Sequence, residues 1–253
     1  MFRACPKCRR PLDAGAAPAI CPGCGLVFAK YLAAQRGEPV RVAARDAANR
    51  EDDTPWRERL LAVPPRVETW IVTLRIALYA VLVAWGWRLW AMDIRTGEIG
   101  GSFTHAVNLV FHEAGHVLFW PLGNFMQIAG GTLMQWLMPV AALVALHHRN
   151  RDNFGASLAL WWLAISVIDA APYAYDALHP QLVLLGGRTG DDGAHDWIEM
   201  LGDLRLLAHA QHIGRLLHWA GFALLLLANV WGALVLRRQW RNRTSEPVRD
   251  EQP

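Results

Sequence analysis

The sequence predicts an all-α polytopic membrane protein, with four to five transmembrane or re-entrant helices behind a small cysteine-bearing N-terminal module. Two observations support this class. Hydrophobic residues make up 53% of the 253-residue chain and charged residues only 19%, which is greasy for a soluble protein. The apolar residues also crowd into residues 70–236, whereas both ends of the chain are polar and arginine-rich. This segregation is typical of an integral membrane protein with soluble ends.

The N-terminal module is defined by its cysteines. Cys5, Cys8, Cys21 and Cys24 form two C-x2-C pairs separated by twelve residues, and four thiolates so spaced can close a tetrahedral shell around zinc. The alternative is two disulfides, which need an oxidising compartment, but the start "MFRACPKCRR" contains no apolar signal-peptide segment. The pattern resembles a zinc ribbon, assigned to residues 1–30. A reduced cysteine site would place the N-terminus in the cytosol.

A linker is predicted over residues 31–68. Helical apolar spacing in 26–37 leads into a stretch rich in Ala, Arg, Asp, Glu and Pro with little periodicity. Within this stretch, "PWRERLLAVPP" is expected to form an interfacial helix on the membrane surface. Residues 69–237 then form the membrane-embedded domain. Residues 238–253 are a basic and then acidic tail that is predicted to be disordered.

Five apolar segments are candidate membrane helices. They cover residues 69–92, 104–120, 131–147, 154–178 and 216–236, with a polar, glycine-rich loop and a short helix over 180–211. If all five crossed, "HHRNR" (147–151) and "RRQWRNR" (237–243) would face outside, against the positive-inside tendency. The conflict disappears if 104–120 and 131–147 together make one crossing, with 104–120 re-entrant or tucked against the other helices.

The segment "LVFHEAGHVLFW" (109–120) places two imidazoles and a carboxylate in an apolar helix. His112 and His116 lie one turn apart on the same face, so they can bind one metal ion together. Glu113 is placed to take a proton from a water on that ion, because zinc lowers the pKa of bound water towards neutrality. The alternative is a pair of hydrogen-bonded core histidines with a glutamate that reaches the surface. Ionisable groups inside membranes are usually functional, which favours the metal site.

"FHEAGH", followed by "AGGTLMQWLMPV", resembles the membrane-embedded zinc metalloproteases of the site-2 protease type, over about residues 104–200. In that family a third ligand, an aspartate, comes from a later transmembrane helix after a proline. The usual L-D-G form is absent, and "SVIDAAPYAYDALHP" (166–180) stands in its place. The resemblance therefore implies Asp176, four residues after Pro172, as the third zinc ligand.

Three further residues remain candidates for the third position. Asp196 and His195 lie beside a glycine-rich loop that could fold over the site, although Asp196 could instead cap a helix starting at Trp197. Asp169 lies two helical turns before Asp176 and could also orient a zinc-bound histidine. The stretch "AGGTLMQW" is expected to be either an extended edge that holds substrate or a turn between helices.

These features predict a zinc-dependent intramembrane or membrane-proximal metallopeptidase in the cell inner membrane. Glu113 would be its catalytic residue, and it would carry one catalytic and one structural zinc. The expected partners are membrane lipids and membrane-anchored protein substrates. A net charge of +3, from scattered arginines near apolar segments, argues against nucleic acid. The alternative is a non-proteolytic membrane adaptor whose zinc ribbon binds a protein or nucleic acid. An ATP-driven protease is excluded because the sequence has no G-x-x-x-x-G-K-[ST] phosphate loop.

Overall fold

A computed structural model describes residues 4–12, 21, 23–24, 26–35, 55–185, 187–190 and 195–246. The chain divides into two compact units, Met1–Trp56 and Arg57–Pro253. The elements in chain order are α1 (Phe28–Gln35), α3 (Trp56–Leu60), β1 (Val67–Glu68), α4 (Thr69–Trp90), η1 (Glu98–Gly101), α5 (Phe103–Phe119), η2 (Trp120–Leu122), α6 (Asn124–Val144), η3 (Ala145–Arg149), α7 (Asn153–Asp176), α8 (Asp196–Asp203), η4 (Leu207–His209), α9 (Ala210–Arg241) and β2 (Arg243–Thr244).

The first unit consists of two cysteine turns followed by α1. In the first turn the Cys5 amide donates to the carbonyl of Arg10 at 2.9 Å, and in the second the Cys21 amide donates to that of Leu26 at 2.8 Å. Helix α1 falls within the predicted helix 26–37, and α3 lies within the segment predicted as an interfacial helix. Half of the predicted linker, residues 36–54, lies outside the described residues.

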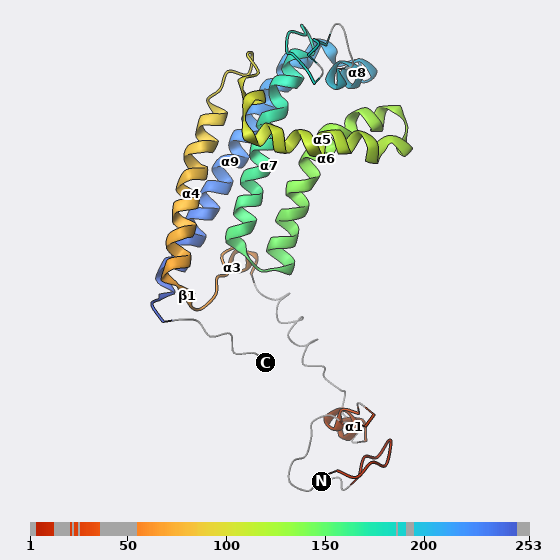
Figure 1. Ribbon diagram of the computed structural model, residues 1–253, viewed down its shortest axis with the longest axis vertical. Coiled ribbons are helices and arrows are strands. Elements are labelled where there is room, and N and C mark those ends of the chain that lie inside the picture. Colours follow the sequence, from red (N-terminus) through yellow and green to blue (C-terminus); the bar gives the residue numbers. More distant parts are fainter. Residues whose placement is uncertain are drawn as a thin grey trace. The chain divides into compact units, whose positions relative to one another are not determined.

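The described residues of the second unit contain four helices that are long and apolar enough to cross a membrane. They are α4, α6 continued by η3, α7, and α9 preceded by η4. Two of them match the predicted segments 69–92 and 154–178 closely, and the other two extend well beyond 131–147 and 216–236. Helix α5 matches the predicted segment 104–120 but lies across the bundle (Figure 1). The segments 104–120 and 131–147 therefore contribute one candidate span between them, as the charge distribution predicted.

Local chemistry sets the ends of α5. The side chain of Ser102 accepts a hydrogen bond from the amide of His105 at 3.1 Å and so caps the first turn. Pro121 interrupts the helical hydrogen bonding after Phe119. Gly123 then adopts a φ of 97°, which only glycine reaches without strain. These residues let the chain reverse from α5 into α6.

Helix α7 is the centre of the bundle. In the most apolar stretch of α7, 78% of the residues are buried, compared with 11% in α4. Side chains from α4, α7 and α9 form the main core cluster, which includes Leu89, Leu160, Trp161, Ile165, Ile168 and Leu225. Because α4 exposes large apolar side chains such as Trp70 and Val81, its outer face suits lipid and not water.

The C-terminal end of α9 corrects the predicted start of the disordered tail. The helix continues through Arg241, and β2 then pairs in parallel with β1, with Val67 opposite Arg243 and Glu68 opposite Thr244. This pairing provides hydrogen-bond partners for backbone N–H and C=O groups of β1 and β2. The sequence pattern did not predict it. Residues 247–253 of the predicted tail lie outside the described residues.

Candidate metal centres

Helices α5 and α6 pack backbone against backbone, which brings the histidines into a crowded interface. A Cβ on Gly115 would lie 2.1 Å from the carbonyl oxygen of Gly130, so neither glycine has room for a side chain. Gly130 and Gly131 lie inside α6, which corrects the expectation of a strand edge or a turn over "AGGTLMQW". Small residues let two apolar helices approach closely. A pair of glycines often indicates a turn, but in this chain the pair serves the close packing of α5 and α6.

His112 and His116 both direct Nε2 towards the same site. The Nδ1–H of His116 donates to the carbonyl oxygen of Gln127 at 2.9 Å, and Nδ1 of His112 lies 3.4 Å from Oε1 of Gln135. A carbonyl can only accept, so the proton sits on Nδ1 and the Nε2 lone pair stays available. Ligand atoms of His112, Glu113 and His116 can be chosen that all lie within 4.8 Å of one another.

A buried polar network fixes the orientation of Gln135. Its amide nitrogen donates to the carbonyl of Ser166 at 3.0 Å and to Oδ2 of Asp169 at 3.2 Å. The amide oxygen is therefore turned towards His112. Asp169 also accepts from Nδ2 of Asn108 at 3.0 Å and contacts Nδ1 of His105 at 2.9 Å. The predicted orienting role of Asp169 thus has a structural path through Gln135.

Asp196, at the first position of α8, is the carboxylate that meets both imidazoles. Its Oδ2 lies 2.8 Å from Nε2 of His112 and 3.4 Å from Nε2 of His116. Ligands around a tetrahedral zinc with bonds of about 2.1 Å lie roughly 3.4 Å apart. One of the two separations already has this value, and the other is that of a hydrogen bond. Lengthening the shorter separation by about 0.6 Å would fit the carboxylate to an ion.

Asp176, the third ligand preferred from sequence, makes its contacts elsewhere. Its buried carboxylate accepts from the amides of Gln181 at 2.8 Å and Leu182 at 3.2 Å, and lies 3.5 Å from Nε2 of His195. The geometry therefore favours Asp196, because Asp176 is occupied in holding the start of the segment that leads to α8. His195 is not at the imidazoles either: it is the N-cap of α8 and accepts from the amide of Ile198 at 3.3 Å.

Tyr173 anchors the start of α8 to α7. Its hydroxyl accepts from the amide of Asp196 at 3.0 Å, and its ring lies 4.2 Å from that of His195 between centroids. Together with Asp176, this contact fixes both ends of the connection between α7 and α8. The position of Asp196 therefore depends on Tyr173 and Asp176 of α7, although neither residue forms a hydrogen bond with His112 or His116.

Gly131 allows the two imidazoles to pack closely against α6. A Cβ at this position would lie 2.6 Å from Nε2 of His112 and 2.7 Å from Nε2 of His116. Any larger residue would therefore press on both coordinating atoms and displace them. Two imidazoles, one carboxylate and an open position match the donor set of a catalytic zinc site. The residues present therefore fit zinc.

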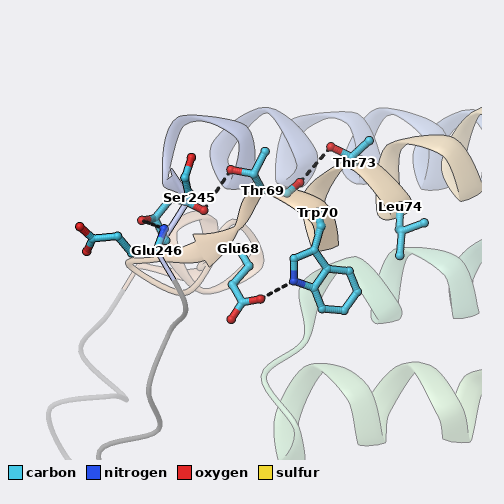
Figure 2. A pocket seen from close by; sticks show the side chains of 8 residues that line it. Glu68, Thr69, Trp70, Thr73, Leu74, Ser245 and Glu246 are labelled. Carbon is cyan, nitrogen blue, oxygen red and sulfur yellow. Dashed lines mark hydrogen bonds between the residues drawn. The ribbon is translucent and has the colours of Figure 1, made fainter.

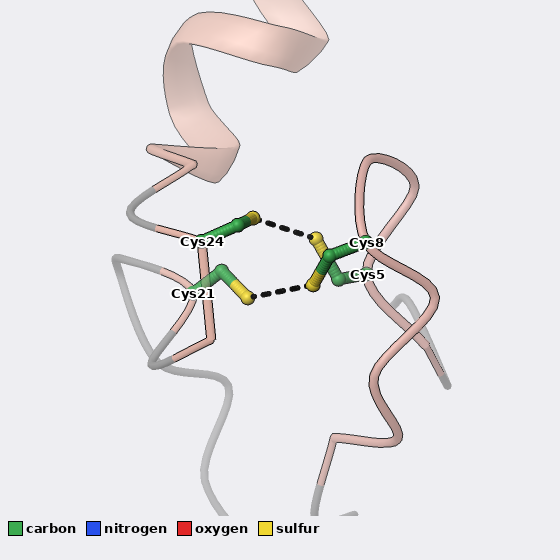
Figure 3. A group of neighbouring side chains, drawn as sticks. All are labelled: Cys5, Cys8, Cys21 and Cys24. Carbon is green, nitrogen blue, oxygen red and sulfur yellow. Dashed lines mark hydrogen bonds between the residues drawn. The ribbon is translucent and has the colours of Figure 1, made fainter.

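The four cysteines form a second candidate metal site (Figure 3). All four are free thiols, with Sγ atoms 3.6 Å apart for Cys5 and Cys24 and 3.7 Å apart for Cys8 and Cys21. Sulfurs around a tetrahedral zinc with bonds of about 2.3 Å lie roughly 3.8 Å apart. Burial alone would raise the pKa of the Cys5 thiol, but backbone hydrogen bonds from Cys8 and Lys7 and the neighbouring thiols lower it, to about 6. A thiolate is therefore available near neutral pH.

An open pocket of about 820 Å³ in the second unit is lined by none of the residues of the histidine site (Figure 2). It is formed where α4 begins and β2 ends, and its lining includes Thr69, Trp70, Leu74 and Ser245. The indole N–H of Trp70 donates to Glu68 at its edge. The pocket contains no cluster of metal ligands among its described residues, so its size does not mark the site of the chemistry.

Sequence reasoning missed the residues that support the histidines. Asn108 precedes His112 by four residues and shares the buried stripe of α5, so helical spacing could have identified it. Gln135 and Tyr173 carried no such signal, because they meet the site only when α6 and α7 pack. No protein-family model, curated protein or solved structure matches this chain.

Replacing Gln135 with leucine is expected to weaken metal binding at the histidines by about 10–100-fold, a typical cost of losing the partner that orients a ligand. The affinity can be measured by competition with a chromogenic chelator. Trp136→Phe is the matched control, because the Trp136 indole donates to the same Ser166 carbonyl at 3.3 Å. Equal affinities for Gln135→Leu and the unchanged protein would show that the network does not orient His112.

Proposed function

We propose that the chain is a zinc-dependent, membrane-embedded peptidase whose catalytic zinc is held by His112, His116 and Asp196. One observation carries this proposal: residues 84 positions apart in sequence bring a carboxylate to two imidazoles, and Gly131 adds no side chain that would press on their Nε2 atoms. The resemblance of "FHEAGH" to the site-2 protease type adds support from sequence.

Each residue would have a distinct role in peptide hydrolysis. Bound zinc would acidify a water molecule and polarise the scissile carbonyl. Glu113 is exposed and follows His112 directly, so its carboxylate can accept the proton that this water loses as the new C–O bond forms. Glu113 would then transfer the proton to the amide nitrogen as the C–N bond breaks. The products are a carboxylic acid and an amine, and no other reactant is needed.

The cysteine cluster would hold a second, structural zinc in a ribbon. Four sulfurs leave no open coordination position for water, so this ion would stabilise the module and not take part in hydrolysis. We further propose that the protein resides in the cell inner membrane with this module in the cytosol, where thiols stay reduced. The module would recognise a protein partner or regulate the embedded domain.

The test of the proposal is Glu113→Gln. This variant is expected to cleave a membrane-anchored candidate substrate roughly 10²–10⁴-fold more slowly, the range for loss of a general acid–base. Its zinc content should stay unchanged, because the side chain is not one of the three proposed ligands. Glu199→Gln, on the first turns of α8, is the control for an altered carboxylate near the site. Undiminished cleavage by Glu113→Gln would reject the mechanism.

The non-proteolytic adaptor remains the second candidate, supported by the gathered thiols alone. Elemental analysis of the purified full chain separates the two candidates. The peptidase requires about two zinc ions per chain, falling to one in His112→Ala/His116→Ala, whereas the adaptor requires one in both proteins.

A further inference from the structure

Building on the proposed peptidase, we infer that the zinc centre opens towards the non-cytosolic face of the membrane and acts on peptide segments presented there. The inference depends on which end of the bundle contains each feature. Two ends can be defined from contacts within the second unit. The arginine end comprises residues 57–67, 147–153 and 237–243, and the distal end comprises residues 90–99, 173–182 and 207–218.

The three segments of the arginine end meet directly. Nδ2 of Asn153 donates to the carbonyls of Arg59 and Ala62, both at 2.8 Å. Val67 pairs with Arg243 between β1 and β2. The starts of α4 and α7 and the end of α9 therefore lie on one side of the apolar layer (Figure 1).

Positive charge is concentrated at this end. Its arginines are Arg57, Arg59, Arg66, Arg149, Arg151, Arg237, Arg238, Arg241 and Arg243. The distal end and the loops between α4 and α5 and between α7 and α9 contain four arginines, Arg95, Arg188, Arg205 and Arg215, and no lysine. Short loops rich in Lys and Arg stay on the cytosolic side. The arginine end is therefore cytosolic.

The zinc centre lies towards the distal end. Tyr173, whose hydroxyl meets the Asp196 amide, is twenty residues beyond the start of α7 and three before its end. At 1.5 Å per residue these separations are about 30 Å and about 4.5 Å, and the hydrocarbon core is about 30 Å thick. Helix α8 and its connection to α7 are also at this end. The path for a peptide is therefore shorter from the distal face than from the cytosolic face, from which most of the length of α7 separates the site.

Cysteine labelling in intact cells tests the orientation. Thr96→Cys at the distal end and Ser245→Cys at the arginine end are exposed positions outside the proposed catalytic machinery. With a membrane-impermeant maleimide, only Thr96→Cys should gain label in intact cells. The unchanged protein and Ser245→Cys should become labelled only after permeabilisation. Labelling of Ser245→Cys in intact cells, with or without Thr96→Cys, would overturn the inference.

Cleavage of an impermeant quenched peptide by sealed vesicles tests access to the site. Right-side-out vesicles should cleave the peptide without detergent, and Glu113→Gln vesicles should not. Cleavage confined to inside-out vesicles would overturn the inference. If labelling gives the expected orientation but no preparation cleaves peptide, even in detergent, the proposed peptidase fails and the orientation stands.

Discussion

Gly131→Ala is expected to lose the metal bound at α5 and to reduce peptide hydrolysis to background. The added Cβ would lie 2.6–2.7 Å from both Nε2 atoms, too close for a normal contact, so it would push the two coordinating nitrogens out of place. The nearest atoms belong to rings that are themselves held at Nδ1, so neither ring can turn away without breaking its hydrogen bond. Zinc content should fall from about two ions per chain to about one, as measured by elemental analysis.

Gly202→Ala provides the control for this experiment. Gly202 is in α8, and a Cβ there would meet nothing within 4 Å. Alanine is favoured over glycine in a helix by roughly 1 kcal/mol, so neither variant should unfold through helix propensity. Far-UV circular dichroism should show equal helix content in both. A Gly131→Ala protein that keeps two zinc ions would show that metal binding does not depend on the close packing of the imidazoles against Gly131.

Asp196→Ala is expected to weaken zinc binding at the histidines by roughly 10³-fold. Structural zinc in zinc-finger peptides binds with about 10–16 kcal/mol of free energy, and dividing this over the four ligands of such a site assigns up to roughly 4 kcal/mol to each. Asp176→Asn should weaken binding by less than about tenfold. Its amide oxygen can still accept from Gln181, and Tyr173 still holds the Asp196 amide. Chelator competition on the full chain measures both.

Asp203→Asn, at the exposed end of α8, controls for the loss of a carboxylate from the same helix. Its zinc affinity should match that of the unchanged protein. A larger loss for Asp176→Asn than for Asp196→Ala would restore the ligand that the proline-then-aspartate pattern implied.

Much of the fold follows from the sequence because its main signals are local. The lengths of the apolar segments identified the candidate membrane spans. The distribution of arginines indicated that segments 104–120 and 131–147 contribute one span between them. The spacing of His112 and His116 defined a shared face, which the structure confirms. Each of these inferences depends only on residues within one segment or next to it, and not on contacts between distant segments.

The third carboxylate could not be chosen from sequence, because it depends on how the connection between α7 and α8 folds back. Asp176 and Asp196 are both acidic residues after Pro172, and only tertiary contacts distinguish them. Asp176 accepts hydrogen bonds from the backbone amides of Gln181 and Leu182, so its carboxylate holds the start of this connection. The glycine pair in α6 was misjudged for a related reason, since a turn and a close helix crossing use the same residues.

Anomalous scattering at the zinc edge, from a structure of the zinc-loaded protein, gives the most direct test. We predict a peak about 2.1 Å from Nε2 of His112, Nε2 of His116 and a carboxylate oxygen of Asp196. A peak beside Asp176, or no peak at these histidines in protein that contains two zinc ions, would contradict the proposed centre.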